Sequence, residues 1–351
     1  LPAAQGAEAA YLTTALQRCG ALADGRVVSV EAEAPRDQLV SRIVRLRLAY
    51  ERAAEAAPRS LILKIGLPGR ANDGPYVQGE REVAFYAKVA SAMPAGMVPR
   101  CFDSAWQAES RQWHLLLEDL TDTHEIATEW PLPPDEVLCR RMVQTLARFH
   151  AAWWDHPRLG VEIGTRIDAE IARQFMHQNA DAYARFADHL GDRLSRERRQ
   201  LYERFFVAAH RVQARVLTWR NVTLVHGDAH VWNCFVPKDG SDDLRYFDWD
   251  TWRIGLASGD LAYMMATHWY PERRRQFERP LLDHYHQALL AHGVQGYGRA
   301  ALAEDYRRSV MMMLVLPPLL WSAGIPPLVW WPHLERITAA VDDLDCRALL
   351  G

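Results

Sequence analysis

The segment 225–250 restricts the possible folds of this chain more than any other part of its 351 residues. An H-G-D triplet ends at Asp228, Asn233 follows five positions later, and Asp248 follows Asp228 by twenty. Short apolar runs flank these residues and predict strands: 222–225, 234–236 and 244–247. The polar residues are therefore expected at strand ends, on two loops that a hairpin joins and a packed scaffold holds.

The residue types and spacing in this segment suit phosphoryl transfer from a nucleotide. One carboxylate must receive the proton of an acceptor hydroxyl, while an amide oxygen and a second carboxylate hold Mg²⁺ against the phosphates. Protein kinases use H-R-D-x-x-x-x-N followed by D-F-G for this task. The segment resembles the aminoglycoside phosphotransferase and choline kinase-like superfamily, whose signature is H-G-D-x-x-x-x-N followed by I-D-[FW]-[DE].

This resemblance implies a role for each residue of the signature. Asp228 is the expected catalytic base for the acceptor hydroxyl, and Asn233 and Asp248 are expected to bind Mg²⁺. His226 is expected to orient the catalytic loop through hydrogen bonds, although a buried core histidine is an equal explanation. Asp250 lies two positions after Asp248, where it could assist the metal, steady the loop or cap a turn.

Other residues near the signature also match the superfamily. Asp260 begins a D-L-A element in which the Asp is expected to cap the next helix and steady the catalytic loop. The stretch 149–154 resembles the end of a family helix, and a packed amphipathic helix explains it as well. His230 and Trp232 project from the catalytic loop and are expected to border the acceptor site.

Lys64 lies in the apolar run Leu61–Ile65, where a charge is unfavourable. In kinase-like folds the matching lysine reaches the α- and β-phosphates and pairs with a helix glutamate. Glu82 begins an E-x-x-F-Y pattern like that of the family, so it is the preferred partner, with Glu80 as the alternative. A solvated lysine on an edge strand is the competing explanation.

The remaining nucleotide contacts are less defined. The stretch 113–120 resembles the hinge strand of the family, which implies that the backbone around Leu117–Leu120, with Glu118 and Leu120, would bind adenine. The phosphate-covering loop is expected at 33–41, which has no glycine, whereas protein kinases need glycines there for close backbone approach. ATP with Mg²⁺ is expected, and GTP is not excluded. Three residues could contact the phosphates instead of glycines: Arg36, Ser41 and Arg42.

The order of elements predicts an α+β, protein kinase-like fold with two lobes. The N-lobe is expected at 1–118, as an antiparallel sheet with one helix, and a mainly helical C-lobe with the catalytic loops and acceptor site at 119–351. Expected strands are 26–33, 44–50, 61–65 and 113–117, with a helix at 78–93. Long amphipathic segments follow at 134–154, 167–188, 192–216, 272–291 and 299–315.

Composition limits the partners and the compartment. A net charge of −3 gives no reason to expect nucleic acid or a membrane surface as a partner. Five scattered cysteines and an N-terminus without a signal-peptide pattern favour a reduced, cytoplasmic setting. The charge-free segment 309–331 could span a bilayer, but five Pro and Gly residues interrupt it, so buried helices are expected instead. Oligomeric state is left open.

The expected acceptor is a small hydroxyl compound with little charge. Residues 251–351 hold ten Asp or Glu and ten Arg, so they offer no acidic excess for a polycation. Eight of the thirteen Trp lie at or after Trp219. Such rings favour an apolar ring system or a quaternary ammonium group, although most are expected in the core. The E-x-x-F-Y pattern and chain length resemble the ecdysteroid kinase-like branch, which acts on larger, less charged alcohols.

Several alternatives remain. An aminoglycoside kinase, a choline or ethanolamine kinase, and a nucleotide-binding pseudoenzyme would share the same fold. Retention of Lys64, Asp228, Asn233 and Asp248 favours an active kinase over a pseudoenzyme. The G-D-x-H stretch at 227–230 also resembles dinuclear metallophosphoesterases, but the later G-N-H that such sites use occurs nowhere in the chain.

Overall fold

The structure is a computed structural model that describes residues 8–38, 41–52, 56–67, 78–94 and 96–351. The chain divides into two compact units. Unit 1 comprises Leu1–Ile126 and Phe235–Trp252, and unit 2 comprises Ala127–Cys234 and Arg253–Gly351. The segment that carries Asp248 therefore belongs to unit 1, while Asp228 and Asn233 belong to unit 2. The lobe boundary at residue 118 stays a prediction.

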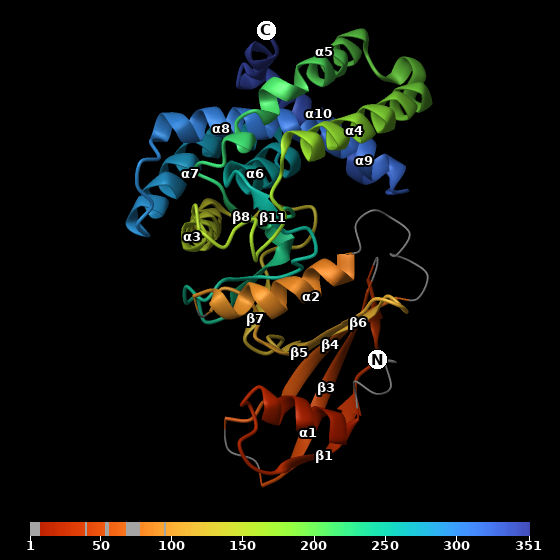
Figure 1. Ribbon diagram of the computed structural model, residues 1–351, viewed down its shortest axis with the longest axis vertical. Coiled ribbons are helices and arrows are strands. Elements are labelled where there is room, and N and C mark those ends of the chain that lie inside the picture. The colour runs from red at the N-terminus through yellow and green to blue at the C-terminus, as the bar shows by residue number, and fades with distance from the viewer. Residues whose placement is uncertain (1–7, 39–40, 53–55, 68–77, 95) are drawn as a thin grey trace. The chain divides into compact units, whose positions relative to one another are not determined.

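An antiparallel sheet with the order β1-β3-β4-β6-β5, to which β2 adds by pairing with β3, forms the scaffold of unit 1 (Figure 1). A second sheet has the order β10-β9-β7, so β9 and β10 form the expected hairpin. The strands are β1 (Arg26–Ala32), β2 (Arg36–Asp37), β3 (Ser41–Glu51), β4 (Ser60–Gly66), β5 (Cys101–Gln107), β6 (Gln112–Glu118), β7 (His124–Ile126), β9 (Cys234–Pro237) and β10 (Arg245–Tyr246). The helices are α1 (Ala9–Arg18) and α2 (Gln78–Lys88).

Alternation along β4 gives its two faces different neighbours. Leu61, Leu63 and Ile65 are buried and share one apolar core with Leu12 and Leu16 of α1. Because successive strand residues point to opposite faces, Lys64 lies on the face away from this core. β4 pairs with both β3 and β6, so it is a central strand and the edge-strand explanation of Lys64 is wrong.

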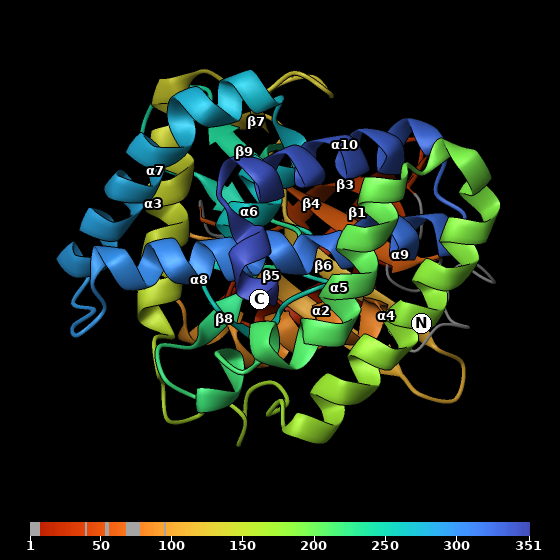
Figure 2. The ribbon, with the colours of Figure 1, turned by 90° about the horizontal axis from the view of Figure 1, so that it is seen from above.

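Unit 2 is mainly helical, and the fold class is α+β, as predicted. Figure 2 shows α3 and α7 side by side, an arrangement that their contacts confirm. The helices are α3 (Glu136–Ala152), α4 (Ala169–Leu190), α5 (Arg196–Gln213), α6 (Ser258–Ala262), α7 (Pro271–Ala291), α8 (Arg299–Met312), α9 (Leu316–Ser322) and α10 (Pro327–Asp343). A π-helical turn, η6 (Tyr263–Thr267), follows α6, and β8 (Thr223–Val225) pairs with β11 (Arg253–Gly255).

Side-chain caps mark where two of the predicted long helices, α3 and α4, begin. Asp135 accepts the Leu138 N–H at 2.8 Å ahead of α3, and Asp168 accepts the Ile171 N–H at 2.8 Å ahead of α4. Each cap satisfies a backbone donor that has no partner inside its helix. The starts of α3 and α4 are therefore encoded locally, ahead of the first apolar turn.

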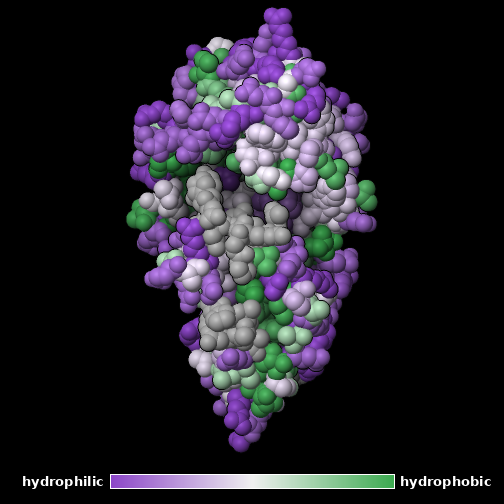
Figure 3. Space-filling model, turned by 90° about the vertical axis from the view of Figure 1, so that its right-hand side faces the viewer, coloured by the Kyte–Doolittle hydropathy of each residue, from purple (hydrophilic) through white to green (hydrophobic). Residues whose placement is uncertain are grey.

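The charge-free segment 309–331 differs from its expectation. It ends α8, forms α9 and begins α10, with Gly324 and Pro326 in the turn between the last two. It is not uniformly buried, because Leu319 is 44% and Leu328 is 69% exposed. On the face drawn in Figure 3, pale and green residues interrupt the hydrophilic surface of unit 2. Within the described ranges, no helix is long and apolar enough to cross a membrane.

Candidate active site

The loop predicted to be catalytic, residues 226–233, belongs to unit 2 and begins where β8 ends at Val225. We call it the catalytic loop. Gly227 has φ +87°, a left-handed conformation that glycine adopts without steric cost, and it turns the chain toward Asp228. The Asn233 side-chain nitrogen donates to the Asp228 carboxylate at 2.9 Å and to the Asp228 carbonyl at 3.0 Å. His226 is buried, and its Nδ1 accepts the Asp228 N–H at 3.3 Å. The predicted base, amide and loop histidine are thus neighbours.

A buried carboxylate fixes the start of this loop. Asp260 accepts the backbone N–H of His226 at 2.7 Å and that of Gly227 at 2.9 Å. His150 Nε2 lies 3.1 Å from the same carboxylate, and its Nδ1 lies 2.7 Å from the Tyr285 hydroxyl. Burial alone would raise the pKa of Asp260, but the hydrogen bond and charge of His150, together with His226 and the Gly227 N–H, lower this pKa overall.

Asp260 departs from its expected position. It lies within α6, whose N-cap position is Ala257, so it does not cap the helix. It does bind the catalytic loop, as the resemblance implied. His150 is the contributor that sequence reasoning left undefined. Its signal was the histidine near the end of the amphipathic helix α3, a position that a packed core histidine would share.

In unit 1, Lys64 lies between two carboxylates. Its Nζ is 2.9 and 2.7 Å from the two oxygens of Glu82 and 2.7 Å from Asp248 Oδ1. Glu80 is exposed, so Glu82 is the contact partner. Burial would lower the pKa of Lys64, but the charges of Asp248 and Glu82 outweigh the effect of burial, so the pKa of Lys64 is raised. The ammonium group is therefore held charged away from bulk water.

Trp249 anchors the turn that presents Asp248. Its ring stacks on Phe85 of α2 at 4.1 Å with an interplanar angle of 5°, and its indole N–H donates to the Tyr246 carbonyl at 3.0 Å. The Trp249 backbone N–H also binds Glu82, so the same carboxylate contacts both the lysine and the turn. Asp248 itself has φ +65°, a left-handed conformation that non-glycine residues rarely adopt outside constrained sites.

The predicted hinge is occupied by contacts within unit 1. The Glu118 N–H donates to the Arg100 carbonyl at 2.8 Å, and the Leu120 carbonyl accepts the N–H groups of Thr123 and His124 at 3.1 and 2.8 Å. The Glu118 carboxylate pairs with Arg245. These groups make contacts within the fold. A role for Glu118 and Leu120 in binding the adenine ring stays a prediction.

The glycine-free loop forms a β2–β3 hairpin, and residues 39–40 lie outside the described ranges. Arg42 makes two hydrogen bonds to Asp37, at 2.6 and 3.0 Å, on the exposed side of this hairpin. Arg36 is exposed and Ser41 is buried. Their contact with phosphates stays a prediction.

A cluster of rings borders Asp228 within unit 2. His230 Nε2 lies 3.5 Å from the Asp228 carboxylate. Four further rings continue from it: Trp232, Tyr263, His268 and His333. Burial lowers the pKa of His268 well below its ordinary value and that of His333 to about 4, so both rings are neutral near pH 7. His230 and Trp232 belong to this cluster, and their predicted place at the acceptor site stays a prediction. The rings from η6 and α10 were not anticipated from the sequence.

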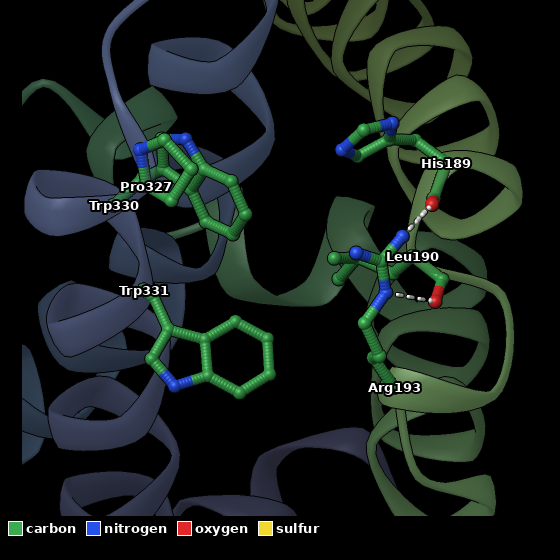
Figure 4. A pocket seen from close by; sticks show the side chains of 6 residues that line it. All are labelled: His189, Leu190, Arg193, Pro327, Trp330 and Trp331. Carbon is green, nitrogen blue, oxygen red and sulfur yellow. Dashed lines mark hydrogen bonds between the residues drawn. The ribbon is translucent and has the colours of Figure 1, made fainter.

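A pocket of about 420 Å³ lies between the end of α4 and the start of α10 (Figure 4). Figure 4 shows the rings of Trp330 and Trp331 on one side and His189, Leu190 and Arg193 on the other. Ring packing supports the tryptophan side of the pocket. The ring centroid of Phe186 lies 5.3 Å from that of Trp330 and 5.8 Å from that of Trp321. Pro327 completes the lining.

The metallophosphoesterase alternative has little support. Such enzymes also use an upstream D-x-H triplet, and one occurs at Asp122–His124. However, His124 Nε2 lies 2.9 Å from the Asp243 carbonyl, so this histidine is engaged in unit 1. In the part of the chain that the structure describes, no group of three or more His, Cys, Asp or Glu is placed to hold a metal ion.

Comparison with known proteins decides the family. The model of the ecdysteroid kinase-like family matches residues 35–294, about three quarters of the chain, including both signature loops. This chain belongs to the ecdysteroid kinase-like family. No curated protein has a significant sequence match to it.

Solved structures share the fold of this family member at low identity. A choline kinase from Cryptosporidium parvum is 10% identical, with 90% of this chain and 91% of that chain covered and a TM-score of 0.55. An aminoglycoside 2′-phosphotransferase-IIIa in complex with GDP is 12% identical, with 97% and 99% covered and a TM-score of 0.53. An amicoumacin kinase with AMP-PNP and Ca²⁺ is 13% identical, with 90% and 88% covered and a TM-score of 0.51.

The chain therefore combines membership of the ecdysteroid kinase-like family with the fold of these solved structures. The likeness to the solved structures is one of fold alone, because all three identities are 13% or lower.

Replacing Asp260 by Asn should destabilise this kinase-family protein by about 2–4 kcal/mol, because it removes the charge that two backbone donors and His150 share. Urea unfolding at pH 7 measures the loss. A lowered carboxyl pKa gives stability that is fully present above the unfolded value and lost as pH falls through the folded one, so the difference should persist at pH 5.

Asp283→Asn is the matched control for this measurement. Asp283 is 47% exposed and pairs with Arg299, so its replacement should cost under about 1 kcal/mol. Equal losses in the two variants would contradict the anchoring role of Asp260.

Proposed function

We propose that this protein is an ATP-dependent kinase that transfers the γ-phosphoryl group to a hydroxyl of a small, weakly charged acceptor. The Asp228–Asn233 pair carries this proposal. A carboxylate oriented by the amide five residues later is what the H-G-D-x-x-x-x-N signature requires, and the two groups lie 2.9 Å apart. The set formed by Lys64, Glu82 and Asp248 supports it independently in unit 1.

Asp228 acts as the base in the proposed reaction. Its carboxylate accepts the proton of the acceptor hydroxyl as that oxygen attacks the γ-phosphorus and the bond from phosphorus to the β-γ bridging oxygen breaks, which releases ADP. Its side chain is 25% exposed, so a substrate can reach it. Asn233 and the loop anchored on Asp260 hold the carboxylate in position, which lowers the entropic cost of alignment.

Asn233 and Asp248 would hold Mg²⁺, which neutralises charge on the phosphates when it is bound. The donor chemistry fits, since Mg²⁺ prefers oxygen ligands. The Asn233 nitrogen makes two hydrogen bonds to Asp228, an orientation that turns the amide oxygen away from that carboxylate. The Asp248 side chain is 39% exposed, so it is accessible to a cation as well as to Lys64.

Lys64 supplies positive charge for the nucleotide phosphates in this proposal. Glu82 is 2% exposed and anchors the ammonium group by two contacts, so the lysine is positioned before a ligand arrives. ATP is the proposed nucleotide and GTP is the alternative. An aminoglycoside, choline or ethanolamine acceptor is less favoured than a weakly charged alcohol, given the equal numbers of acidic and basic residues in 251–351.

Asp228→Asn should lower turnover by at least about 10²–10⁴-fold while the nucleotide still binds, because the amide cannot accept the hydroxyl proton. The measurement is product mass with a library of hydroxyl compounds, alongside calorimetric binding of ATP. The same screen on the unmodified protein tests the proposed function itself. Turnover near normal in the variant would exclude Asp228 as the base.

Glu82→Gln should raise the KM for ATP by about tenfold, because Lys64 loses the charged partner that fixes its position. Glu80→Gln is the control, since this exposed residue lies on the same helix two positions earlier and should leave KM unchanged. Lys64→Ala should lower stability as well as turnover, because it leaves the buried Glu82 carboxylate without its cation. Identical KM values for the two glutamine variants would contradict the assignment of Glu82.

Kanamycin-type aminoglycosides should be poor acceptors, because a pocket that takes up several ammonium groups must offer carboxylates to offset their desolvation. A bulkier, weakly charged alcohol should be preferred. Steady-state kinetics with both classes tests this directly. A kcat/KM for kanamycin of about 10⁴ M⁻¹s⁻¹ or more, which is ordinary for an enzyme and its substrate, would overturn the acceptor class.

A further inference from the structure

We propose that the pocket between α4 and α10 holds the non-reacting body of the acceptor and selects neutral or anionic alcohols that carry a flat apolar ring system. This inference rests on the proposed function and deepens it, because it assigns a place and a charge preference to the acceptor. The pocket is the one lined by His189, Leu190, Arg193, Pro327, Trp330 and Trp331 (Figure 4).

The size and walls of this pocket suit a small ligand. Its volume of about 420 Å³ falls within the range of about 300–1,000 Å³ that ligand sites occupy. Trp330 is 3% exposed and packs edge-on against Phe186, so the wall on α10 is already formed. His189 of α4 is likewise held by a ring contact of 5.1 Å with Trp321 of α9. A rigid aromatic wall favours flat ring systems, which stack without further ordering of side chains.

A row of rings within unit 2 runs from the pocket wall to the proposed base. Trp330 and His333 lie three residues apart on α10 and therefore on one side of that helix. His333 lies 4.8 Å from His268, and His268 lies 5.3 Å from His230. His230 in turn lies 3.5 Å from the Asp228 carboxylate. Ring contacts therefore connect α10, which carries half of the pocket lining, to the loop of the proposed base.

Polar atoms beside Asp228 indicate where the hydroxylated end of the acceptor would lie. His230 Nδ1 and Trp232 Nε1 are buried and find no hydrogen-bond partner among the described residues. Buried polar atoms without partners are uncommon in folded proteins, and a bound ligand or water supplies them where they occur. The acceptor would thus place polar groups near the base and apolar rings in the pocket.

The charge of the lining sets the selectivity. Arg193 donates to the His189 and Leu190 carbonyls at 2.6 and 3.0 Å, as Figure 4 shows, and these bonds hold its guanidinium group at the pocket. Its formal charge stays positive, and the described lining contains no acidic side chain. The facing segment 309–331 also carries no charge. A quaternary ammonium group would therefore stack on tryptophan beside a like charge, which disfavours it.

Three matched probes test the inference: 2-naphthalenemethanol, its 6-carboxylate and its 6-trimethylammonium derivative. Calorimetry without nucleotide measures their binding to the full chain. We expect the neutral and anionic probes to bind more tightly than the cation. Trp331→Ala should weaken the neutral probe by about tenfold through lost stacking and burial. Arg193→Gln should weaken the carboxylate by about threefold and strengthen the ammonium probe.

Two control variants separate pocket contacts from general effects. Val207→Ala removes an apolar side chain that is 81% exposed on α5, and Arg196→Gln removes an exposed positive charge three residues after Arg193. Neither should change the affinity for any probe. Tightest binding by the cation, no detectable binding by any probe, or equal effects of control and pocket variants would overturn the inference. So would a change from dimer to monomer upon Trp331→Ala, which would mark a self-association surface.

Turnover separates this inference from the proposed function. With the best acceptor from the alcohol screen, Trp331→Ala should raise KM by about tenfold and leave kcat within about twofold. An unchanged KM with normal turnover would contradict the assignment of the pocket to the acceptor, while the proposed kinase function would stand. Probe binding that depends on Trp331 in a protein that phosphorylates no alcohol would support the pocket and reject the function.

Discussion

The loop that carries the proposed base, Asp228, depends on one buried carboxylate in unit 2. Asp260 receives two backbone N–H groups from the start of the catalytic loop and contacts His150 of α3, which in turn contacts Tyr285 of α7. A charge removed from water is costly unless every oxygen has a partner, and here three groups supply partners. The loop conformation and the packing of α3, α6 and α7 therefore stabilise one another, and Asp228 takes its position from them.

In unit 1 the buried charge that needs partners is a cation, the Lys64 ammonium group. A lysine in a central strand is unfavourable unless carboxylates surround it, and Glu82 and Asp248 approach it from α2 and from the turn after β10. Period-two alternation on β4 makes this possible, because one face joins the apolar core with α1 while the other presents Lys64. One strand thus contributes to folding with one face and to the candidate site with the other.

Local patterns in the sequence predicted much of this. Alternation predicted β3, a short apolar run predicted β4, and amphipathic periodicity predicted the long helices. The signature spacing placed Asp228 beside Asn233. What was missed depends on tertiary contacts. His150 and Asp260 are 110 residues apart, and nothing near either one specifies the other. β5 escaped prediction because CFDSAWQ lacks clean alternation, and α1 is short, with only Leu12, Ala15 and Leu16 buried.

The charge-free segment shows why composition alone misled. Apolar content predicted burial, yet proline and glycine broke the segment into short helices that cannot bury every face, and Leu328 stays 69% exposed. The same breaks bring Trp330 and Trp331 to the start of α10, facing the end of α4.

The geometry of α6 and η6 connects the loop anchor to the ring cluster. Asp260 lies in α6, and the π-helical turn that begins at Tyr263 follows without a break and leads to His268. Such turns widen a helix locally and recur at functional sites. One continuous segment carries both the carboxylate that anchors the loop of Asp228 and two rings beside that loop. The proposed base and the proposed acceptor surface therefore depend on the same segment, so a substitution that shifts α6 should affect both.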